Sequence, residues 1–215
     1  WWMGNFYNPK KLQRDYSKAR RKPRVCYPAS GAHFDVENRV NQADDFEHVR
    51  DVIRKTVNDI QWVFIGAYPL PLHPYVEQGL IEFHPWARLY EYPALLNSIN
   101  ATVFIAPLQD NTFNRAKSDL KYIEACCYGI PAVCQDICTY SNAPFRFTTG
   151  DDLIDQIRKI TKSFSAYKKY SREARDEANR RWLELDENID KYGELYRHPY
   201  KSPERKFINS LEENK

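Results

Sequence analysis

The sequence lacks the cysteine patterns of a disulfide framework or a zinc site. Its five cysteines are an odd number, none lies in a CxxC pair, and none has the Cys/His spacing of a zinc ligand set. We interpret them as small buried residues, because Cys26 and Cys134 lie in expected strands and Cys126 and Cys127 in an expected helix. Free cysteines of this kind are typical of a reducing compartment, and the sequence predicts a cytoplasmic protein with no bound metal.

Long hydrophobic runs are also missing. No apolar stretch approaches the length of about 18 residues that a membrane-spanning helix needs, so we expect no transmembrane segment. No secretory signal peptide is recognisable. The chain begins with Trp1 and Trp2 and has its single methionine at position 3, which we interpret as the start of a fragment.

Charge of one sign is not in excess over the whole chain, since 32 basic and 29 acidic residues give a net charge of +3. Basic residues nevertheless gather near the N-terminus, opposed only by Asp15: Lys10, Lys11, Arg14, Lys18, Arg20, Arg21, Lys22 and Arg24. Such a run is typical of a nucleic-acid or anionic-surface patch, or of a solvated connector between domains. We favour a connector over residues 1–23, and the nucleic-acid alternative stays open.

From Arg24 onward, short apolar segments alternate with amphipathic ones, as in a doubly wound α/β fold with a parallel sheet. The expected strands are 24–28, 61–67, 80–84, 102–106, 131–135 and 144–147. The expected helices are 46–57 with an N-cap at Asn41, 90–97, 151–162, 167–186 and 189–197. We therefore predict a Rossmann-like domain over 24–165, followed by a C-terminal helical segment over 166–215.

Residues 114–133 carry the most informative pattern, which predicts a polar loop, an amphipathic helix and a buried strand. Leu120, Ile123 and Cys127 share one face of the expected helix. Gly129 is placed to adopt the left-handed conformation that ends a helix, and Pro131 prevents its continuation.

The start of this helix has the residues of an anion site. Lys117 and Ser118 lie where free backbone N–H groups and the positive end of the helix dipole attract anions. Glu124 lies two turns further along the same helix. A basic, hydroxyl-bearing helix N-terminus with a carboxylate nearby suits a ligand that carries both phosphate groups and sugar hydroxyls.

These residues support a resemblance to a known family. The segment resembles the donor-binding motif of family-1-type glycosyltransferases of GT-B architecture, in the branch that reads Phe113-Asn114, Lys117-Ser118, Lys121, Glu124 and Gly129-Ile130-Pro131. Segments 24–35, 62–66, 81–86 and 103–108 resemble the first four strands of the same donor domain, in the same order. The resemblance covers roughly residues 24–165 and is most specific over 113–133.

The resemblance implies the C-terminal, donor-binding half of a GT-B enzyme. The donor would be a nucleoside-diphosphate sugar, transferred with retention of configuration and with no cofactor or essential metal. Glu124 would accept hydrogen bonds from both ribose hydroxyls. Lys117 and His33 are the implied catalytic residues. The donor-binding candidates are Ser30, Gly31, His84, Asn114, Lys117, Ser118, Lys121 and Glu124; Trp86 is a further candidate for stacking on the base, with core packing as its alternative.

The sequence departs from the commonest family pattern at one position. Typical members carry a glutamate where this chain has Ala116, and Asn114 or Asp110 would then contact the sugar. A GT-B enzyme also needs an acceptor-binding domain, which residues 1–23 are too short to provide. We therefore expect a preceding domain or a partner chain.

Three functions follow from these patterns. The first is a glycosyltransferase, hexosyl or pentosyl, acting on a glycan, a lipid-linked glycan, a protein or a modified nucleic acid. The second is a nucleotide-sugar-binding module without catalysis. The third is a nucleic-acid-associated protein that uses the basic N-terminal run.

Overall fold

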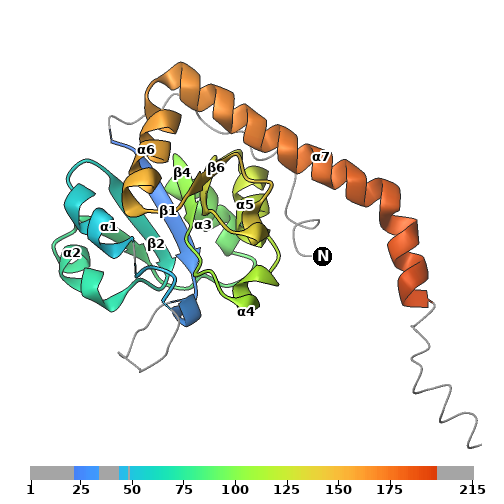
Figure 1. The fold of residues 1–215 in the computed structure, drawn as a ribbon, viewed down its shortest axis with the longest axis horizontal. Coiled ribbons are helices and arrows are strands. Elements are labelled where there is room, and N and C mark those ends of the chain that lie inside the picture. Colours follow the sequence, from blue (N-terminus) through green and yellow to red (C-terminus); the bar gives the residue numbers. More distant parts are fainter. Residues whose placement is uncertain (1–21, 34–43, 48, 198–215) are drawn as a thin grey trace, which may run out of the picture. The chain divides into compact units, whose positions relative to one another are not determined.

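The described part of the computed structural model contains one parallel sheet of six strands (Figure 1). They are β1 (Arg24–Ala29), β2 (Gln61–Gly66), β3 (Ile81–His84), β4 (Val103–Ala106), β5 (Ala132–Gln135) and β6 (Phe145–Phe147). Their order is β3-β2-β1-β4-β5-β6, and each neighbouring pair is parallel. The strand order reverses between β1 and β4, so the expected doubly wound, Rossmann-like fold is confirmed.

The structure describes residues 22–33, 44–47 and 49–197, with side chains as far as Arg181. The helices in this part are α1 (Arg50–Thr56), α2 (His73–Glu77), α3 (Tyr92–Ile99), α4 (Thr112–Arg115), α5 (Leu120–Cys127), α6 (Gly150–Thr161) and α7 (Phe164–Arg197). Short 3-10 turns lie at Gly31–His33, Leu70–Leu72 and Cys138–Tyr140. By its contacts the chain divides into two units, Trp1–Ala178 and Asn179–Lys215.

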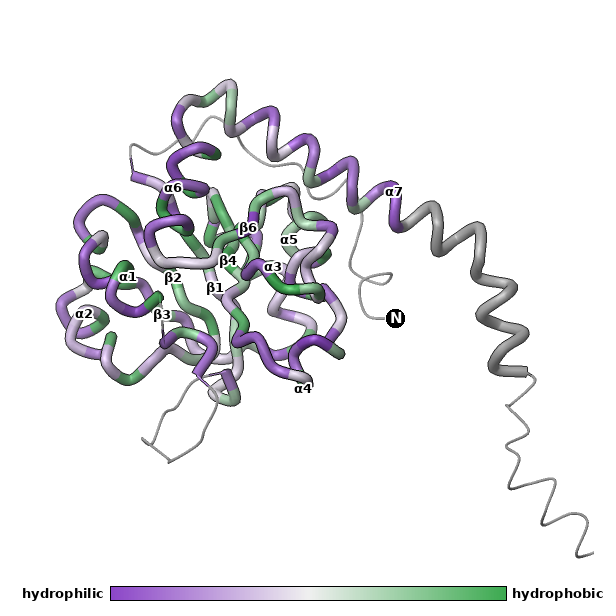
Figure 2. The backbone as a smooth tube through the Cα atoms, in the orientation of Figure 1, coloured by the Kyte–Doolittle hydropathy of each residue, from purple (hydrophilic) through white to green (hydrophobic). Residues whose placement is uncertain are grey.

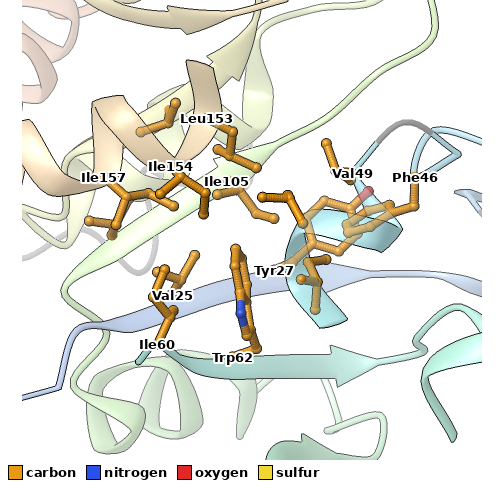
Figure 3. Packing of buried hydrophobic residues seen from close by; sticks show 14 of the residues in the cluster. Val25, Tyr27, Phe46, Val49, Ile60, Trp62, Ile105, Leu153, Ile154 and Ile157 are labelled. Atoms are coloured by element: carbon orange, nitrogen blue, oxygen red, sulfur yellow. The ribbon is translucent and has the colours of Figure 1, made fainter. Parts of the chain in front are cut away.

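Alternate residues of the strands face opposite sides of the sheet, and each side has its own core. Val25 and Tyr27 of β1 belong to one cluster, whereas Cys26 between them belongs to the other. Figure 3 shows the first cluster, in which Leu153 and Ile154 of α6 lie over the side chains of β1 and β2. Because the central strands are buried on both faces, they are hydrophobic along their length (Figure 2).

The second cluster lies on the other face of the sheet, beneath α3, α5 and the beginning of α7. Leu96 and Ile99 of α3 pack there with Ala125 of α5, and Ala174 and Ala178 of α7 join the same cluster. The first part of α7 is therefore a component of this core.

A local sequence signal determines where α6 begins. Thr149 is its N-cap: the Thr149 hydroxyl accepts from the backbone N–H of Asp152 at 3.1 Å, and the Asp152 carboxylate accepts from the Thr149 N–H at 3.1 Å. This reciprocal pair is a capping box, and it satisfies two backbone donors that the helix itself leaves unpaired.

Several expectations about the helices are corrected by the structure. The first helix begins at Arg50 rather than at Phe46, and its expected cap, Asn41, lies outside the described residues. The two helices expected over 167–197 form one continuous helix, α7. The loop before α5 contains α4, which Asn111 caps through its side chain.

The expected buried face of α5 is partly wrong. Leu120 has 54% of its surface exposed, and the buried face is formed instead by Tyr122, Ala125 and Cys126, together with Cys127. The helical period is the same for both faces, so the pattern alone left the choice open. The expected end of the helix is confirmed, since Gly129 has a left-handed φ of +63°.

Candidate functional site

A cavity of about 390 Å³ opens at the carboxyl edge of the sheet, next to the point where the strand order reverses. Its walls come from the last residues of β1 and β2, from the segments after β1, β3, β4 and β5, and from the first residues of α3 and α5: Pro28, Ala29, Ser30, His33, Ile65, Trp86, Tyr92, Leu108, Lys117, Ser118, Leu120, Lys121, Glu124 and Tyr140. Ligands of open parallel sheets bind at this position, because the loops diverge there and leave a crevice. Figure 1 shows the arrowhead of β1 and helix α4 at this edge.

Two lysines line the cavity beside α5. Lys121 donates from Nζ to the carbonyl oxygen of Pro28 at 2.5 Å, and its Nζ lies 4.4 Å from the ring centroid of Tyr27. Burial lowers the pKa of Lys121 from 10.5 to about 8, although Glu124 and Asp45 oppose this shift. Lys117 precedes the helix, with Nζ 4.9 Å from the ring centroid of Phe113. The cavity therefore has two cationic groups close to the end of β1.

Glu124 lies one turn beyond Lys121 and faces the same cavity. Burial raises the pKa of Glu124, while Lys121 and a hydrogen bond from the Tyr92 hydroxyl act in the opposite direction. Tyr92 lies at the start of α3, and burial raises the pKa of its hydroxyl, so it remains a donor. Glu124 is thus held from one side by Tyr92, and a ligand in the cavity can approach the carboxylate directly.

His33 lines the cavity from the 3-10 turn after β1 and pairs with a buried carboxylate. Its Nδ1 lies 2.7 Å from Oδ2 of Asp45. The other oxygen of Asp45 accepts from the backbone N–H of Gln109, after β4, at 2.8 Å. Asp45 therefore connects the segments that follow two neighbouring strands.

Trp86 forms a further part of the wall. Its side chain is largely exposed, at 62%, and its indole packs on Gly66 at the end of β2. A Cβ at Gly66 would lie 2.4 Å from the Ala29 carbonyl oxygen and 3.0 Å from the indole, and the φ of this residue is +90°. Only glycine fits between β1 and the indole at this point.

The structure brings together most of the sequence-derived site residues. Ser30, His33, Lys117, Ser118, Lys121 and Glu124 all line the cavity. Ser118 precedes α5 rather than lying within it, since the helix begins at Leu120 after Asp119. Lys117 and Ser118, the residues from which we expect an anion site, thus lie in the loop before the helix.

Gly31, His84 and Asn114 do not line this cavity. His84 is 2.7 Å from Glu82 through Nε2, and Gly31 has open space where a Cβ would lie. Asn114 is buried, with Nδ2 donating to the Gln109 carbonyl oxygen at 2.8 Å and to Oδ1 of Asp45 at 3.4 Å. It supports the loop that carries Lys117.

Asp110, the other candidate for the sugar, is exposed and forms a two-pronged ion pair with Arg115 at 2.6 and 2.8 Å. That hydrogen bonding lowers the pKa of the Asp110 carboxyl. Sequence reasoning did not select Asp45, Tyr92 or Tyr140. No motif links Asp45 to His33 or Tyr92 to Glu124, and only folding brings each pair together.

The basic N-terminal run lies mostly outside the described residues, which contain only Lys22 and Arg24 of it. Lys22 donates from Nζ to the carbonyl oxygen of Val57 at 2.7 Å. Arg24 is buried and donates to the Ile99 carbonyl oxygen at 2.9 Å and to Glu82 at 2.7 Å. Both residues thus stabilise the folded domain through hydrogen bonds within the chain.

Among the described residues, no group of three His, Cys, Asp or Glu side chains is placed to hold a metal ion. The same part of the chain contains no helix that is long and apolar enough to cross a membrane.

No protein-family model matches the chain, and no curated protein matches it. Several solved structures do match it, among them TarM and Anabaena HepE. TarM has a TM-score of 0.50 and 12% identity, over 81% of this chain and 37% of TarM. Anabaena HepE (Alr3699), in complex with UDP and glucose, has a TM-score of 0.54 and 13% identity, over 87% of this chain and 53% of HepE.

Both of these proteins are GT-B glycosyltransferases. This chain has the Rossmann-like fold of that class. The resemblance inferred from residues 113–133 is thus confirmed at the level of the fold. The chain spans about a third to a half of the length of these two neighbours.

Proposed function

We propose that this chain is the donor-binding part of a glycosyltransferase that uses a nucleoside-diphosphate sugar. The observation that carries the proposal is the cavity at the strand-order reversal, where Lys117, Lys121 and Glu124 meet. Two cations and one carboxylate match a ligand with a diphosphate and a pair of ribose hydroxyls. HepE, which shares the fold, was crystallised with UDP and glucose, and this supports the same ligand class.

Each residue has a role in this proposal. Lys117, Ser118 and Lys121 bind the diphosphate, and Glu124 accepts hydrogen bonds from the ribose hydroxyls. The indole of Trp86, exposed at the cavity wall, offers a surface on which the base stacks. Lys117 and His33 stabilise the negative charge that develops on the departing diphosphate.

The reaction replaces one bond at the anomeric carbon with another. The bond from that carbon to the diphosphate oxygen breaks, the bond to the acceptor hydroxyl oxygen forms, and the proton of that hydroxyl leaves with the diphosphate. We propose that the transfer retains anomeric configuration and needs no cofactor or metal. The sugar is a hexose or pentose, and the acceptor is a glycan, a lipid-linked glycan, a protein or a modified nucleic acid.

The acceptor is bound elsewhere in this proposal. Because the chain spans 37% of TarM and 53% of HepE, a second domain or a partner chain supplies the acceptor site. The five free cysteines, four of them buried, favour a cytoplasmic location.

A second candidate is a nucleotide-sugar-binding module without catalysis. The observation that favours it is Ala116, which is exposed and brings no carboxylate to the place where typical family members carry a glutamate. Such a module would bind the donor but transfer no sugar when the acceptor-binding domain is added.

Calorimetric titration of the full chain with UDP, GDP, ADP and CMP tests the proposal. We expect one nucleoside diphosphate to bind. Glu124→Gln should lower the affinity for it by about 10–100-fold, because hydrogen bonds to a charged group are worth about 1.5–3 kcal/mol. The matched control is Glu77→Gln, an exposed carboxylate of α2, which should leave the affinity unchanged. Absence of binding by all four ligands, or equal binding by both variants, would contradict the proposal.

A further inference from the structure

We propose that Asp45 is a positioning residue, which holds the ring of His33 so that Nε2 faces a phosphate oxygen of the bound nucleoside diphosphate. This inference rests on the proposed function, because it takes the ligand of the cavity to be a nucleoside diphosphate. It goes beyond that function by assigning a role to a residue that does not line the cavity.

Two hydrogen bonds join Asp45 to His33. The backbone N–H of Asp45 donates to the His33 carbonyl oxygen at 3.1 Å, and Oδ2 of Asp45 lies 2.7 Å from Nδ1 of His33. The main chain and the side chain of Asp45 thus both form hydrogen bonds with His33. The Asp45 side chain is 5% exposed and the His33 side chain 21%, so the histidine forms the accessible end of the pair.

The remaining oxygen of Asp45 is also engaged. Oδ1 accepts from the Gln109 backbone N–H at 2.8 Å and from Nδ2 of Asn114 at 3.4 Å. Asn114 is itself fixed, because Nδ2 also donates to the Gln109 carbonyl oxygen at 2.8 Å and Thr139 donates to the Asn114 carbonyl oxygen at 2.6 Å. The Asp45 carboxylate therefore has a fixed orientation before any ligand enters.

This fixed carboxylate determines how the imidazole meets a ligand. A carboxylate only accepts hydrogen bonds, so Nδ1 of His33 carries a hydrogen and Nε2 is the nitrogen left for the cavity. No hydrogen bond joins Nε2 to a protein group among the described residues. When the ring is protonated, Nε2 donates to a phosphate oxygen while Asp45 balances the charge of the ring.

The other charged groups at the cavity would bring a phosphate close to His33. Lys117, Lys121 and Glu124 also line it, so the site holds cations beside a single carboxylate before the His33–Asp45 pair is counted. Lys121 already donates to the carbonyl oxygen of Pro28, on the β1 side of the cavity. A phosphate that reaches the lysines would lie next to the turn that carries His33.

One isosteric substitution separates this role from a merely structural one. In Asp45→Asn, the amide oxygen can still accept from Gln109 and Asn114, so the contacts between the segments remain. The amide nitrogen that replaces Oδ2 donates instead of accepting, so Nδ1 of the neutral ring must accept and the ring hydrogen moves to Nε2. The protonated ring, which donates to the phosphate oxygen, then loses both its hydrogen-bond acceptor and the carboxylate that balances its charge, and UDP binding weakens for that reason. Asp45→Asn therefore alters the hydrogen bonding of the His33 ring and keeps the hydrogen bonds that Gln109 and Asn114 donate to residue 45.

Titration of UDP and of uridine into the wild type, Asp45→Asn, His33→Gln and the double variant tests the inference. We expect each single variant to lower the affinity for UDP by about tenfold. The double variant should lose no more affinity than a single variant does, because Asp45 acts through His33. Uridine, which has no phosphate, should bind all four proteins equally. Asp44→Asn is the matched control, since Asp44 is a buried neighbour that contacts Arg50 and the Phe46 N–H.

Additive losses in the double variant, or an equal loss for uridine, would overturn the inference. Nitrogen NMR of His33 in the ligand-free chain, assigned by the signal missing in His33→Gln, provides the second readout. We expect the neutral ring to carry its hydrogen on Nδ1 in the wild type and on Nε2 in Asp45→Asn. The same tautomer in both proteins would refute the positioning role even if UDP fails to bind, whereas failure of every nucleotide to bind the wild type would refute the proposed function.

Discussion

Lys121 and Glu124 lie one turn apart on α5 and face the same cavity, yet both are disfavoured in their charged forms. Burial lowers the pKa of Lys121 to about 8 and raises the pKa of Glu124, while each group partly offsets the shift of the other. The folded chain therefore keeps two charges in a partly dry cavity at a cost in stability. An anionic ligand would favour the charged form of Lys121 and reduce that cost.

The cost has a pH dependence that can be measured. Between about pH 8 and pH 10.5 the unfolded chain keeps the proton of Lys121 and the folded chain does not, so the unfolded state binds more protons. The contribution of Lys121 to the free energy of unfolding therefore rises with pH across this window. We expect the difference in unfolding free energy between the wild type and Lys121→Met to shift in favour of the wild type as pH rises.

Chemical denaturation at a series of pH values gives this difference. Lys55→Met, at an exposed position of α1, is the control and should give a difference that does not change with pH. A flat difference for Lys121→Met as well would mean that the Lys121 amine is as well solvated in the folded chain as in the unfolded chain.

At the scale of the element, α5 shows how one helix serves both core and cavity. Ala125 and Cys126 face the core, while Leu120, Lys121 and Glu124 face the cavity. The end of the helix is fixed by tertiary contact: the carbonyl oxygen of Gly129, the residue after its C-cap, accepts from Ser171 Oγ of α7 at 2.5 Å. The helix that carries the site is thus anchored at its far end.

Gly129 is the residue of this anchor at which a substitution should lower stability most. Its φ is +63°, and an added Cβ would lie 3.0 Å from the Arg175 guanidinium. We expect Gly129→Ala to lower the free energy of unfolding by about 1–2 kcal/mol, because an L-residue is strained in the left-handed region. Gly31→Ala, where φ is not positive and the space is open, should change it by less than about 0.5 kcal/mol in the same denaturation experiment. Equal effects would contradict this explanation.

At the scale of the whole molecule, two hydrophobic layers hold the sheet and fix the cavity at its edge. Leu153 of α6 is fully buried in one layer, whereas Leu120 of α5 is 54% exposed beside the cavity. Both are leucines in amphipathic helices, so their sequences alone give no reason to treat them differently.

The two leucines should therefore differ sharply in their effect on stability. We expect Leu153→Ala to cost about 2–5 kcal/mol, because it leaves a cavity in a closely packed core. Leu120→Ala should change the free energy of unfolding by no more than about 0.5 kcal/mol. Thermal or chemical unfolding of both variants measures this, and a large loss for Leu120→Ala would show that the side chain is covered in solution.

The sequence by itself determined the strands, their order along the chain and the helix end at Gly129, because these depend on local apolar runs and backbone preferences. It also predicted Lys117, Ser118, Lys121 and Glu124 as one group, since Lys117 and Ser118 come just before the helix whose repeat places Lys121 and Glu124 one turn apart. Only the tertiary structure decided that Leu120 faces outward and that Asn114 is a buried support. It alone joined Asp45 to His33 and Tyr92 to Glu124, because residues far apart in sequence meet only when the loops at the carboxyl edge of the sheet converge.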